Sequence, residues 1–205
     1  MLMQGVMGVD MYNWTTNGLW INGPGDTQWK YKLDEGVLYI AFQGSCSKLD
    51  WFQNFMFWTK PYKRMNGIWF AHAGFVSKWK AVEDEIFDIV GESEAQKVIV
   101  SGFSQGAAIA QLCHESIRFH FPSKNCTCFA YASPRVFSML GFRHVKKRLS
   151  GITLFERWHD IVCKLPSWIM LYRKTVKPVK IDKWWPLSLR LTEIHMNYEK
   201  YLKEQ

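Results

Sequence analysis

Between residues 97 and 113 the chain reads Lys97-Val98-Ile99-Val100-Ser101-Gly102-Phe103-Ser104-Gln105-Gly106-Ala107-Ala108-Ile109-Ala110-Gln111-Leu112-Cys113. The β-branched run at its start predicts a buried strand, and the small residues after Gly106 predict a helix packed closely on a sheet. The two join at Gly102-x-Ser104-x-Gly106, where a side chain at either glycine would collide with the neighbouring strand or helix. The Ser104 hydroxyl is then pushed out of the fold above a helix N-terminus, which favours developing negative charge. The pattern suits a nucleophile, although a Gly-Ser turn in another α/β protein would also produce it.

The size of the chain suits one sizeable core. It has 205 residues, of which 48% are hydrophobic, which is short for two domains. No apolar run approaches the ~20 residues of a membrane helix, and the start lacks a basic region followed by a sustained apolar stretch. We therefore expect one domain over residues 1–205 in a soluble protein, with a cytoplasmic location favoured.

The five cysteines are irregularly spaced, which favours buried free thiols in a reducing compartment over a disulfide framework or a zinc site. We therefore expect no metal and no cofactor. The formal net charge is +8, but the basic residues are scattered and form no nucleic-acid motif, so no nucleic-acid partner is expected. Solvated surface is the default interpretation of this charge, and contact with an anionic lipid interface is the alternative.

Strand and helix patterns alternate through the middle of the chain. Residues 10–25 are rich in turn formers and are expected to cross the surface, and residues 29–42 form a predicted hairpin. Predicted strands at 69–75, 98–100, 127–132 and 152–155 are separated by predicted helices at 75–90, 107–119 and 138–149, followed by short strands within 164–181 and a terminal helix at 192–203. This order predicts an α/β protein with a mostly parallel central sheet covered by helices on both faces.

Aromatic residues gather between Lys48 and Arg64. Trp51, Phe55 and Trp58 fall on one face of a predicted helix, with Phe52 beside them. Because large rings lose much burial free energy in water, these side chains are covered by protein, as in a core helix, or they meet an apolar ligand or a lipid surface.

Chain order selects the partners of Ser104. A nucleophilic serine needs a histidine base held by a carboxylate, and on this kind of strand–turn–helix the order is serine, acid, histidine. Asp160 follows the C-terminal end of a predicted strand, where active-site groups gather in open parallel sheets, and His195 is the only histidine after it. The candidate triad is therefore Ser104, Asp160 and His195. Asp182 and Glu193 are weaker alternative acids, and His195 alone would be an ordinary surface histidine.

A tetrahedral oxyanion needs preorganised donors. The N–H of Gln105, directly after the nucleophile, is the first candidate. The second is the N–H of Ser45, assisted by its hydroxyl, on the glycine-containing bend that follows the predicted strand at 37–42.

Several motifs in the chain together resemble the fungal-type, class 3 lipases of the α/β-hydrolase fold. In order they are Ala41-Phe42-Gln43-Gly44-Ser45 followed by Asp50-Trp51, His72-Ala73-Gly74-Phe75, Gly102-Phe103-Ser104-Gln105-Gly106, Tyr131-Ala132-Ser133-Pro134-Arg135-Val136, and Asp160-Ile161-Val162 with Leu165-Pro166. The chain departs from the family at Gln43, where arginine is usual, and at Cys163, where proline is common. Its region before His195 is also compact, which leaves the acyl pocket undefined.

The resemblance implies a serine carboxylester hydrolase that cleaves acylglycerols or related lipid esters through an acyl-enzyme intermediate. It implies Ser104, Asp160 and His195 as the triad and Ser45 and Gln105 as the oxyanion hole. It also makes residues 46–65 a candidate lid carrying Trp51, Phe52, Phe55 and Trp58, with possible peripheral contact with a lipid interface. A phospholipase or a short-chain esterase is the alternative enzyme, and a catalytically silent lipid- or protein-binding scaffold is the alternative of another class.

Overall fold

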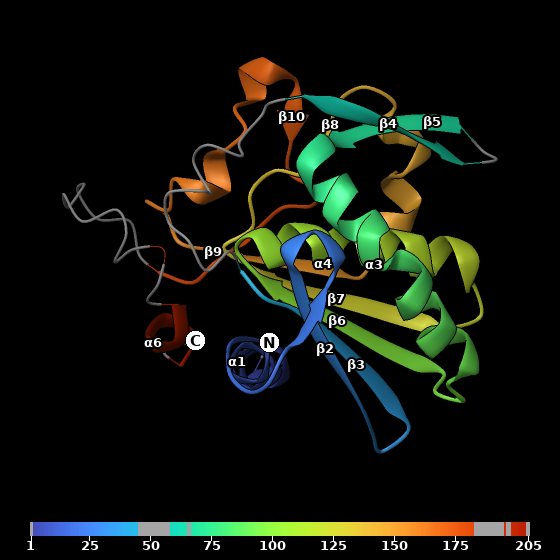
Figure 1. The fold of residues 1–205 in the computed structure, drawn as a ribbon. Helices are drawn as coiled ribbons and strands as arrows, with labels where there is room; N and C mark the ends of the chain where they lie inside the picture. The colour runs from blue at the N-terminus through green and yellow to red at the C-terminus, as the bar shows by residue number, and fades with distance from the viewer. Residues whose placement is uncertain (1, 45–57, 65–66, 183–194, 196–197, 204–205) are drawn as a thin grey trace.

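The computed structural model describes residues 2–44, 58–64, 67–182, 195 and 198–203. Its centre is a seven-stranded sheet in the spatial order β1-β2-β3-β6-β7-β9-β11 (Figure 1). In this sheet β2 pairs antiparallel with both β1 and β3, whereas the pairs β3–β6, β6–β7, β7–β9 and β9–β11 are parallel. The bounds are β1 (Ile21–Gly23), β2 (Thr27–Asp34), β3 (Val37–Phe42), β6 (Lys97–Phe103), β7 (Asn125–Tyr131), β9 (Ile152–Glu156) and β11 (Val179–Lys180). The predicted mostly parallel α/β sheet is confirmed.

Helices cover both faces of this sheet. On one face lie α3 (Ala73–Glu92) and α4 (Gln105–His120), and on the other lie α1 (Leu2–Thr16) and α6 (Tyr198–Leu202) (Figure 1). Because strand side chains alternate between faces, Val98 and Val100 of β6 join the core beneath α3 and α4, whereas Ile99 joins the core beneath α1 and α6. The uninterrupted apolar run of β6 therefore reflects burial on both sides.

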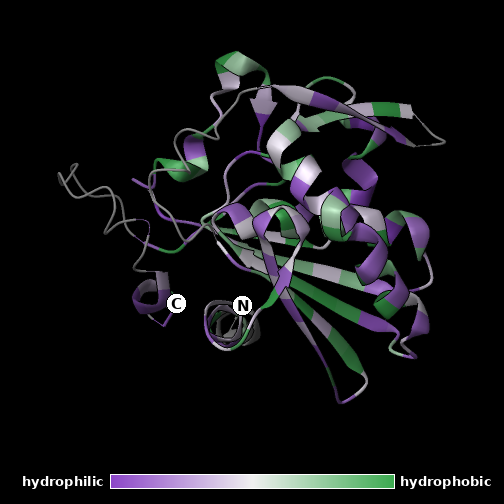
Figure 2. Ribbon diagram, in the orientation of Figure 1, coloured by the Kyte–Doolittle hydropathy of each residue, from purple (hydrophilic) through white to green (hydrophobic). Residues whose placement is uncertain are grey.

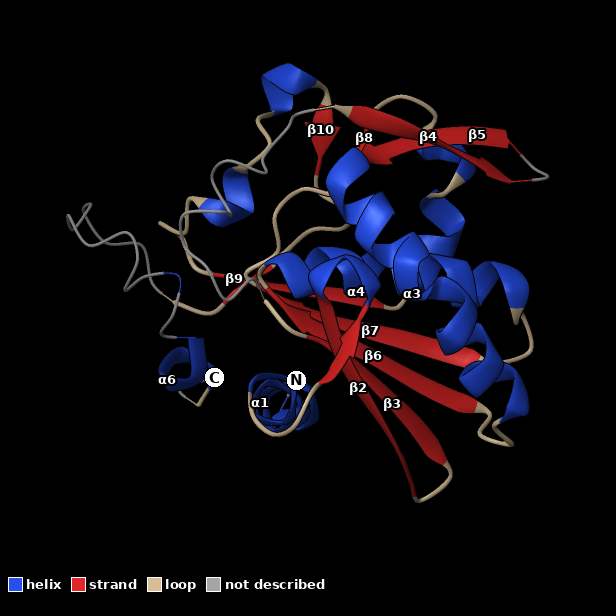
Figure 3. Ribbon diagram, viewed as in Figure 1, coloured by secondary structure: helices blue, strands red, loops and turns tan. Residues whose placement is uncertain are grey.

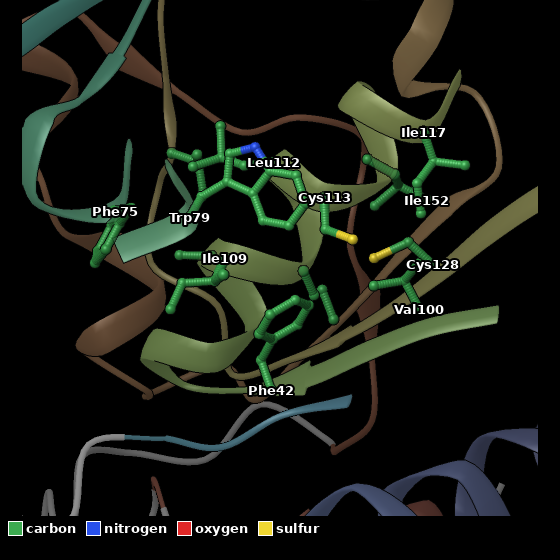
Figure 4. Packing of buried hydrophobic residues seen from close by; sticks show 14 of the residues in the cluster. Phe42, Phe75, Trp79, Val100, Ile109, Leu112, Cys113, Ile117, Cys128 and Ile152 are labelled. Atoms are coloured by element: carbon green, nitrogen blue, oxygen red, sulfur yellow. The ribbon is translucent and has the colours of Figure 1, made fainter. Parts of the chain in front are cut away.

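The larger of the two cores lies between the sheet and the α3–α4 pair. Trp79 of α3 is fully buried, and Figure 4 shows it close to Leu112 of α4, with Phe42 of β3 packed beneath Ile109. Figure 2 shows hydrophobic residues concentrated on the strands and on the helix surfaces that face them. This packing fixes the start of α4 against the end of β3, which positions Ser104.

A second, four-stranded antiparallel sheet was not predicted. It has the order β10-β8-β5-β4 and lies beyond α3 and α4 from the large sheet (Figure 3). Its strands are β4 (Thr59–Arg64), β5 (Gly67–His72), β8 (Phe137–Ser138) and β10 (Tyr172–Arg173). The predicted strand at 69–75 therefore ends at His72, where α3 begins, and residues 59–64 of the candidate lid segment are a paired strand.

Helix α1 also corrects the prediction of surface turns over residues 10–25. Met11, Tyr12 and Thr15 are buried, and the Tyr12 ring packs edge-on against Phe103 and Tyr131. Tertiary packing therefore overrides the turn preference of the Asp and Asn residues in this segment, and the turn residues end the helix near Gly18 instead.

Short 3₁₀ turns replace the helix predicted at 138–149. Gly141 breaks the segment with a left-handed φ of 69°, because a side chain there would lie 2.2 Å from the Ile68 carbonyl oxygen. The 3₁₀ turns in the described residues are η1 (Pro24–Asp26), η2 (Phe142–His144), η3 (Lys146–Leu149), η4 (Val162–Lys164) and η5 (Trp168–Met170). Of the helix predicted at 192–203, the structure describes His195 and α6 as helical.

Candidate active site

Ser104 lies on a strained turn between β6 and α4. Its φ of 54° and ψ of −120° are unusual for a residue with a side chain, and its N–H donates to the Tyr131 carbonyl at 2.9 Å. A Cβ at Gly102 would lie 2.3 Å from the Gly106 carbonyl oxygen, and a Cβ at Gly106 would lie 2.2 Å from the Phe42 carbonyl oxygen. Both glycines are therefore required by close backbone packing, as the sequence predicts.

The structure brings the three candidate triad residues together. The His195 Nε2 atom lies 2.9 Å from Ser104 Oγ, and its Nδ1 atom lies 2.9 Å from Asp160 Oδ2. A ring protonated at Nδ1 donates to the carboxylate and accepts the serine proton at Nε2. The arrangement can therefore activate the Ser104 hydroxyl as a nucleophile and stabilise the imidazolium that results.

Asp160 is fully buried yet well supplied with donors. The Val162 N–H donates to Oδ1 at 2.9 Å, and the Tyr198 hydroxyl donates to Oδ2 at 2.8 Å. Burial raises the pKa of the Asp160 carboxyl, but the hydrogen bond and charge of His195, together with these two donors, outweigh it and hold the pKa below its usual value. Asp160 therefore stays ionised as the partner of His195.

Tyr198 is a site residue that the sequence reasoning missed. Its side chain is fully buried, and its hydroxyl also accepts the Arg157 N–H at 3.1 Å. It thus links the Asp160 carboxylate to the loop that carries it. The available signal was helical spacing, because residues three apart, such as His195 and Tyr198, share one helix face.

The alternative acids do not take the place of Asp160. Asp182 accepts the Arg157 Nε–H at 3.1 Å and the Trp158 N–H at 2.9 Å, so its carboxylate fixes the start of the loop before Asp160. Glu193 lies outside the described residues. In the part of the chain that the structure describes, no cluster of three or more His, Cys, Asp or Glu residues could hold a metal ion.

Of the two predicted oxyanion donors, the structure describes Gln105. Its N–H is the first of α4, and the first amides of a helix have no intrahelical acceptor. Ser45 lies outside the described residues, but its neighbour Gly44 sits beside the nucleophile, since a Cβ at Gly44 would lie 3.4 Å from Ser104 Cβ. The bend after β3 therefore adjoins the Ser104 turn.

The aromatic lid residues Trp51, Phe52 and Phe55 lie outside the described residues. Trp58 is described, and it corrects the prediction for this one residue, because it is not helical and lies directly before β4. Its carbonyl accepts the Ala73 N–H at 2.9 Å and the Tyr172 hydroxyl at 3.3 Å. Its side chain is 73% exposed.

Comparison with known proteins identifies the family. A family model described as lipase (class 3) matches residues 39–170, a range that contains Ser104, Gln105 and Asp160. The chain belongs to the class 3 lipase family. The secreted mono- and diacylglycerol lipase A of Penicillium camembertii is 32% identical over 141 residues, which are 66% of this chain and 45% of that protein. A lipase of Rhizopus niveus is 32% identical over 107 residues, which are 49% of this chain and 27% of the relative.

Solved structures of this family have the same fold. The mono- and diacylglycerol lipase of Aspergillus oryzae is 27% identical with a TM-score of 0.68, over 78% of this chain and 61% of that one. Lipase II of Rhizopus niveus is 25% identical with a TM-score of 0.67, over 75% and 62% of the two chains. The α/β-hydrolase fold is therefore confirmed. The chain matches less than half the length of these two sequence relatives.

The comparison overturns the expected cytoplasmic location, because the Penicillium relatives are named as secreted proteins. Four of the five cysteines are free and buried, as expected, at Cys113, Cys126, Cys128 and Cys163, and Cys46 lies outside the described residues. Burial raises the pKa of each of these thiols above its usual value, which keeps them unreactive without a reducing compartment. None of the helices in the described residues is long and apolar enough to span a membrane.

Proposed function

We propose that the chain is a serine carboxylester hydrolase that cleaves acylglycerols or related lipid esters through an acyl-enzyme intermediate. The observation that carries the proposal is the unbroken hydrogen-bond chain from Ser104 Oγ through His195 to Asp160, with 2.9 Å at each step. Its relatives named mono- and diacylglycerol lipase support acylglycerols as the substrate class.

In the proposed first half-reaction, Ser104 Oγ attacks the ester carbonyl carbon while His195 Nε2 takes the hydroxyl proton. The Gln105 N–H donates to the oxyanion of the tetrahedral intermediate, and the Ser45 N–H is the predicted second donor. The intermediate collapses to an acyl-serine, and His195 gives its proton to the leaving alcohol oxygen.

Water completes the reaction. His195 accepts a proton from the water as its oxygen attacks the acyl carbonyl, and the second tetrahedral intermediate releases the carboxylic acid as the proton returns to Ser104 Oγ. Asp160 stays ionised throughout and orients the ring, while Tyr198 and Val162 hold Asp160. The residues in this scheme need no metal.

Hydrolysis of p-nitrophenyl butyrate and p-nitrophenyl palmitate tests the proposal, the palmitate with and without an emulsion interface. We expect Ser104→Ala to lower turnover by about 10⁴-fold or more. Ser150→Ala is the matched control, since Ser150 is exposed and its hydroxyl donates to the Lys147 carbonyl. Full turnover in Ser104→Ala would refute the mechanism, and no turnover by the folded wild type would favour a silent scaffold. Dependence on chain length and interface separates a lipase from a short-chain esterase.

A further inference from the structure

The surface built by residues 133–182 is cationic. This segment holds eleven of the 26 Lys and Arg residues but only three of the 18 Asp and Glu residues. Each of the three carboxylates is buried and bonded within the protein: Glu156 to Lys174 and Lys180, Asp160 to His195, and Asp182 to Arg157. The segment therefore presents no acidic side chain to balance its outer charges.

Seven cations in the segment form no ion pair with a described acidic residue. They are Arg135, Arg143, Lys146, Lys147, Lys164, Arg173 and Lys177. Lys146, Lys164 and Lys177 are exposed. Unbalanced surface charge of one sign raises the local concentration of oppositely charged partners.

Exposed apolar side chains gather on the same segment. Among the described residues, fifteen large hydrophobic side chains are exposed, and nine of them belong to this segment. Four of the nine are consecutive, in η5 and directly after it: Trp168 (64% exposed), Ile169 (73%), Met170 (39%) and Leu171 (48%). Figure 1 shows η5 projecting beyond β10 at the edge of the molecule, and Figure 2 shows its apolar character. We call these four residues the apolar tip.

The apolar tip has a defined conformation. Ser167 Oγ accepts the Ile169 N–H at 3.3 Å at the start of η5, and Leu171 closes the turn with a left-handed φ of 62°. The Leu171 carbonyl accepts the Met139 N–H at 2.7 Å and the Ser138 hydroxyl at 3.1 Å. The tip is thus anchored to β8, next to the exposed side chains of Met139 and Leu140.

A cationic groove meets the tip at Met139, whose N–H donates to the Leu171 carbonyl and which lines the groove. A groove of about 820 Å³ places Met139 and Phe142 together with Lys146, Arg173 and Lys177. An adjoining pocket of about 480 Å³ shares Lys174 and Pro178 with that groove and adds Arg135 and Lys164. Apolar protrusion and cationic groove therefore form one continuous surface.

The same surface reaches the candidate active site. The adjoining pocket is also lined by Asp160, and the exposed side chains of Trp158 and Ile161 flank that residue in the chain, each 41% exposed. A partner bound here would lie against the loop that carries the catalytic acid.

We propose that the apolar tip and its cationic groove dock the protein on an anionic lipid surface. Apolar side chains on a fixed protrusion can enter the boundary between headgroups and acyl chains, while Lys and Arg remain at the level of the lipid phosphates and carboxylates. The inference deepens the proposed function and rests on it, since docking would bring the ester substrates of a lipid surface to the Ser104 site.

Binding of the full chain to vesicles tests the docking surface. The Ser104→Ala background is used throughout, so that substrate turnover does not alter the vesicles. The vesicles are phosphatidylcholine alone or phosphatidylcholine mixed with phosphatidylserine. We expect stronger binding to the anionic vesicles at low salt and a progressive loss of this preference as salt is added.

Two pairs of substitutions separate the charge from the apolar tip. Lys164→Glu with Lys177→Glu is expected to weaken binding to anionic vesicles by about 25-fold or more, at about fivefold for each cation lost. Trp168→Ser with Ile169→Ser is expected to weaken binding to both kinds of vesicle by about tenfold or more.

The matched control is Leu33→Ser with Lys97→Glu. Both residues are exposed. Leu33 lies near the end of β2 and Lys97 begins β6, and these ends of the two strands are remote from η5 (Figure 1). This control should bind both kinds of vesicle as tightly as the Ser104→Ala protein without further substitutions. Thermal midpoints of all variants establish that they are folded.

Three outcomes would overturn the proposal: equal binding of the parent to both vesicle types at low salt, equal losses in the control, or a stable dimer that depends on Trp168. The last would make a second copy of the chain the occupant of this surface. Failure of the proposed function is a separate result, since it is read from Ser104-dependent ester turnover and not from vesicle binding.

Discussion

The Tyr198 hydroxyl serves two buried groups at once. It donates to Asp160 Oδ2 at 2.8 Å and accepts the Arg157 N–H at 3.1 Å. Tyr198→Phe should lower the free energy of unfolding by about 1–3 kcal/mol, because it leaves the Arg157 N–H without its partner. It should also raise the pKa of Asp160, because it removes one donor that favours the carboxylate.

The measurement is the pH dependence of kcat/KM for Tyr198→Phe with a soluble ester, alongside denaturant unfolding. A positioning role predicts that the acid limb moves to higher pH. Tyr201→Phe is the matched control, because the Tyr201 ring lies over Arg157 and its hydroxyl has no part in the Asp160 network. A stability loss with an unchanged pH profile would reduce Tyr198 to a structural role.

The chemistry that a nucleophilic serine requires and the order of the residues along the chain were enough to select Ser104, Asp160 and His195 from the sequence. Asp160 follows the end of a predicted strand, and His195 is the only histidine after it. The structure places His195 2.9 Å from Ser104 Oγ and 2.9 Å from Asp160 Oδ2. Tyr198 was missed because its role depends on a backbone N–H and a carboxylate that lie about 40 residues away in the chain. The roles of Ser45 and of the aromatic residues at 51–55 stay predictions.

The strand–turn–helix element at β6 and α4 tolerates little change at Gly106. A Cβ there would lie 2.2 Å from the Phe42 carbonyl oxygen and 2.5 Å from the Gln43 carbonyl oxygen, so β3 and α4 would have to separate. We expect Gly106→Ala to cost about 1–3 kcal/mol or more of stability and to lower ester turnover by displacing Ser104.

Gly91→Ala is the matched control for Gly106→Ala. Gly91 lies in α3, and the nearest atom to a Cβ there is a Phe121 ring carbon at 3.6 Å. Alanine favours helix over glycine by about 0.5–1 kcal/mol, so this variant should be as stable as the wild type or more so. Urea unfolding of both variants checks the contrast, and equal stability of the two would contradict the packing account.

Elements with strong local patterns were predictable, whereas those made by distant pairing were not. The apolar run at Val98–Val100 and the helical periodicity of 75–90 identified β6 and α3. The four-stranded sheet escaped prediction because β8 and β10 have two residues each and pair across more than 30 positions. Helix α1 escaped because its polar residues favour turns until Tyr12 packs on Phe103 and Tyr131.

The stability of the whole molecule should depend on pH through two buried histidines. Burial lowers the pKa of His72 to about 4. Burial, assisted by the charge of Arg118, lowers the pKa of His114 to about 4 against the opposing hydrogen bonds of its ring. Between the ordinary histidine value and pH 4 the unfolded chain binds two protons that the native protein does not.

The free energy of unfolding should therefore fall as pH decreases from about 6.5 to 4, with a slope of at most about 2.7 kcal/mol per pH unit. Asp160 affects stability at lower pH than the two histidines. Its stabilising effect is present above its unfolded pKa and is lost as pH falls through its depressed native pKa. Urea unfolding across this range measures the slope. His114→Gln should halve it, and a flat profile from pH 6.5 to 4 would contradict the account.

The charge of the whole chain was known from the sequence, but its distribution was not. The eleven cations of residues 133–182 are spread along the chain. Only the fold buries the three carboxylates of this segment and leaves its cations beside the apolar tip. Burial of charge depends on tertiary contacts, which the hydrophobic periodicity of the sequence does not predict.

Covalent labelling of Ser104 tests the central claim most directly. The intact protein is treated with a fluorophosphonate probe, and mass spectrometry locates the adduct in wild type, Ser104→Ala and His195→Gln. The account predicts one adduct, on Ser104, that is absent from Ser104→Ala and forms far more slowly in His195→Gln. A folded wild type that remains unlabelled, or an adduct on another serine, would contradict it.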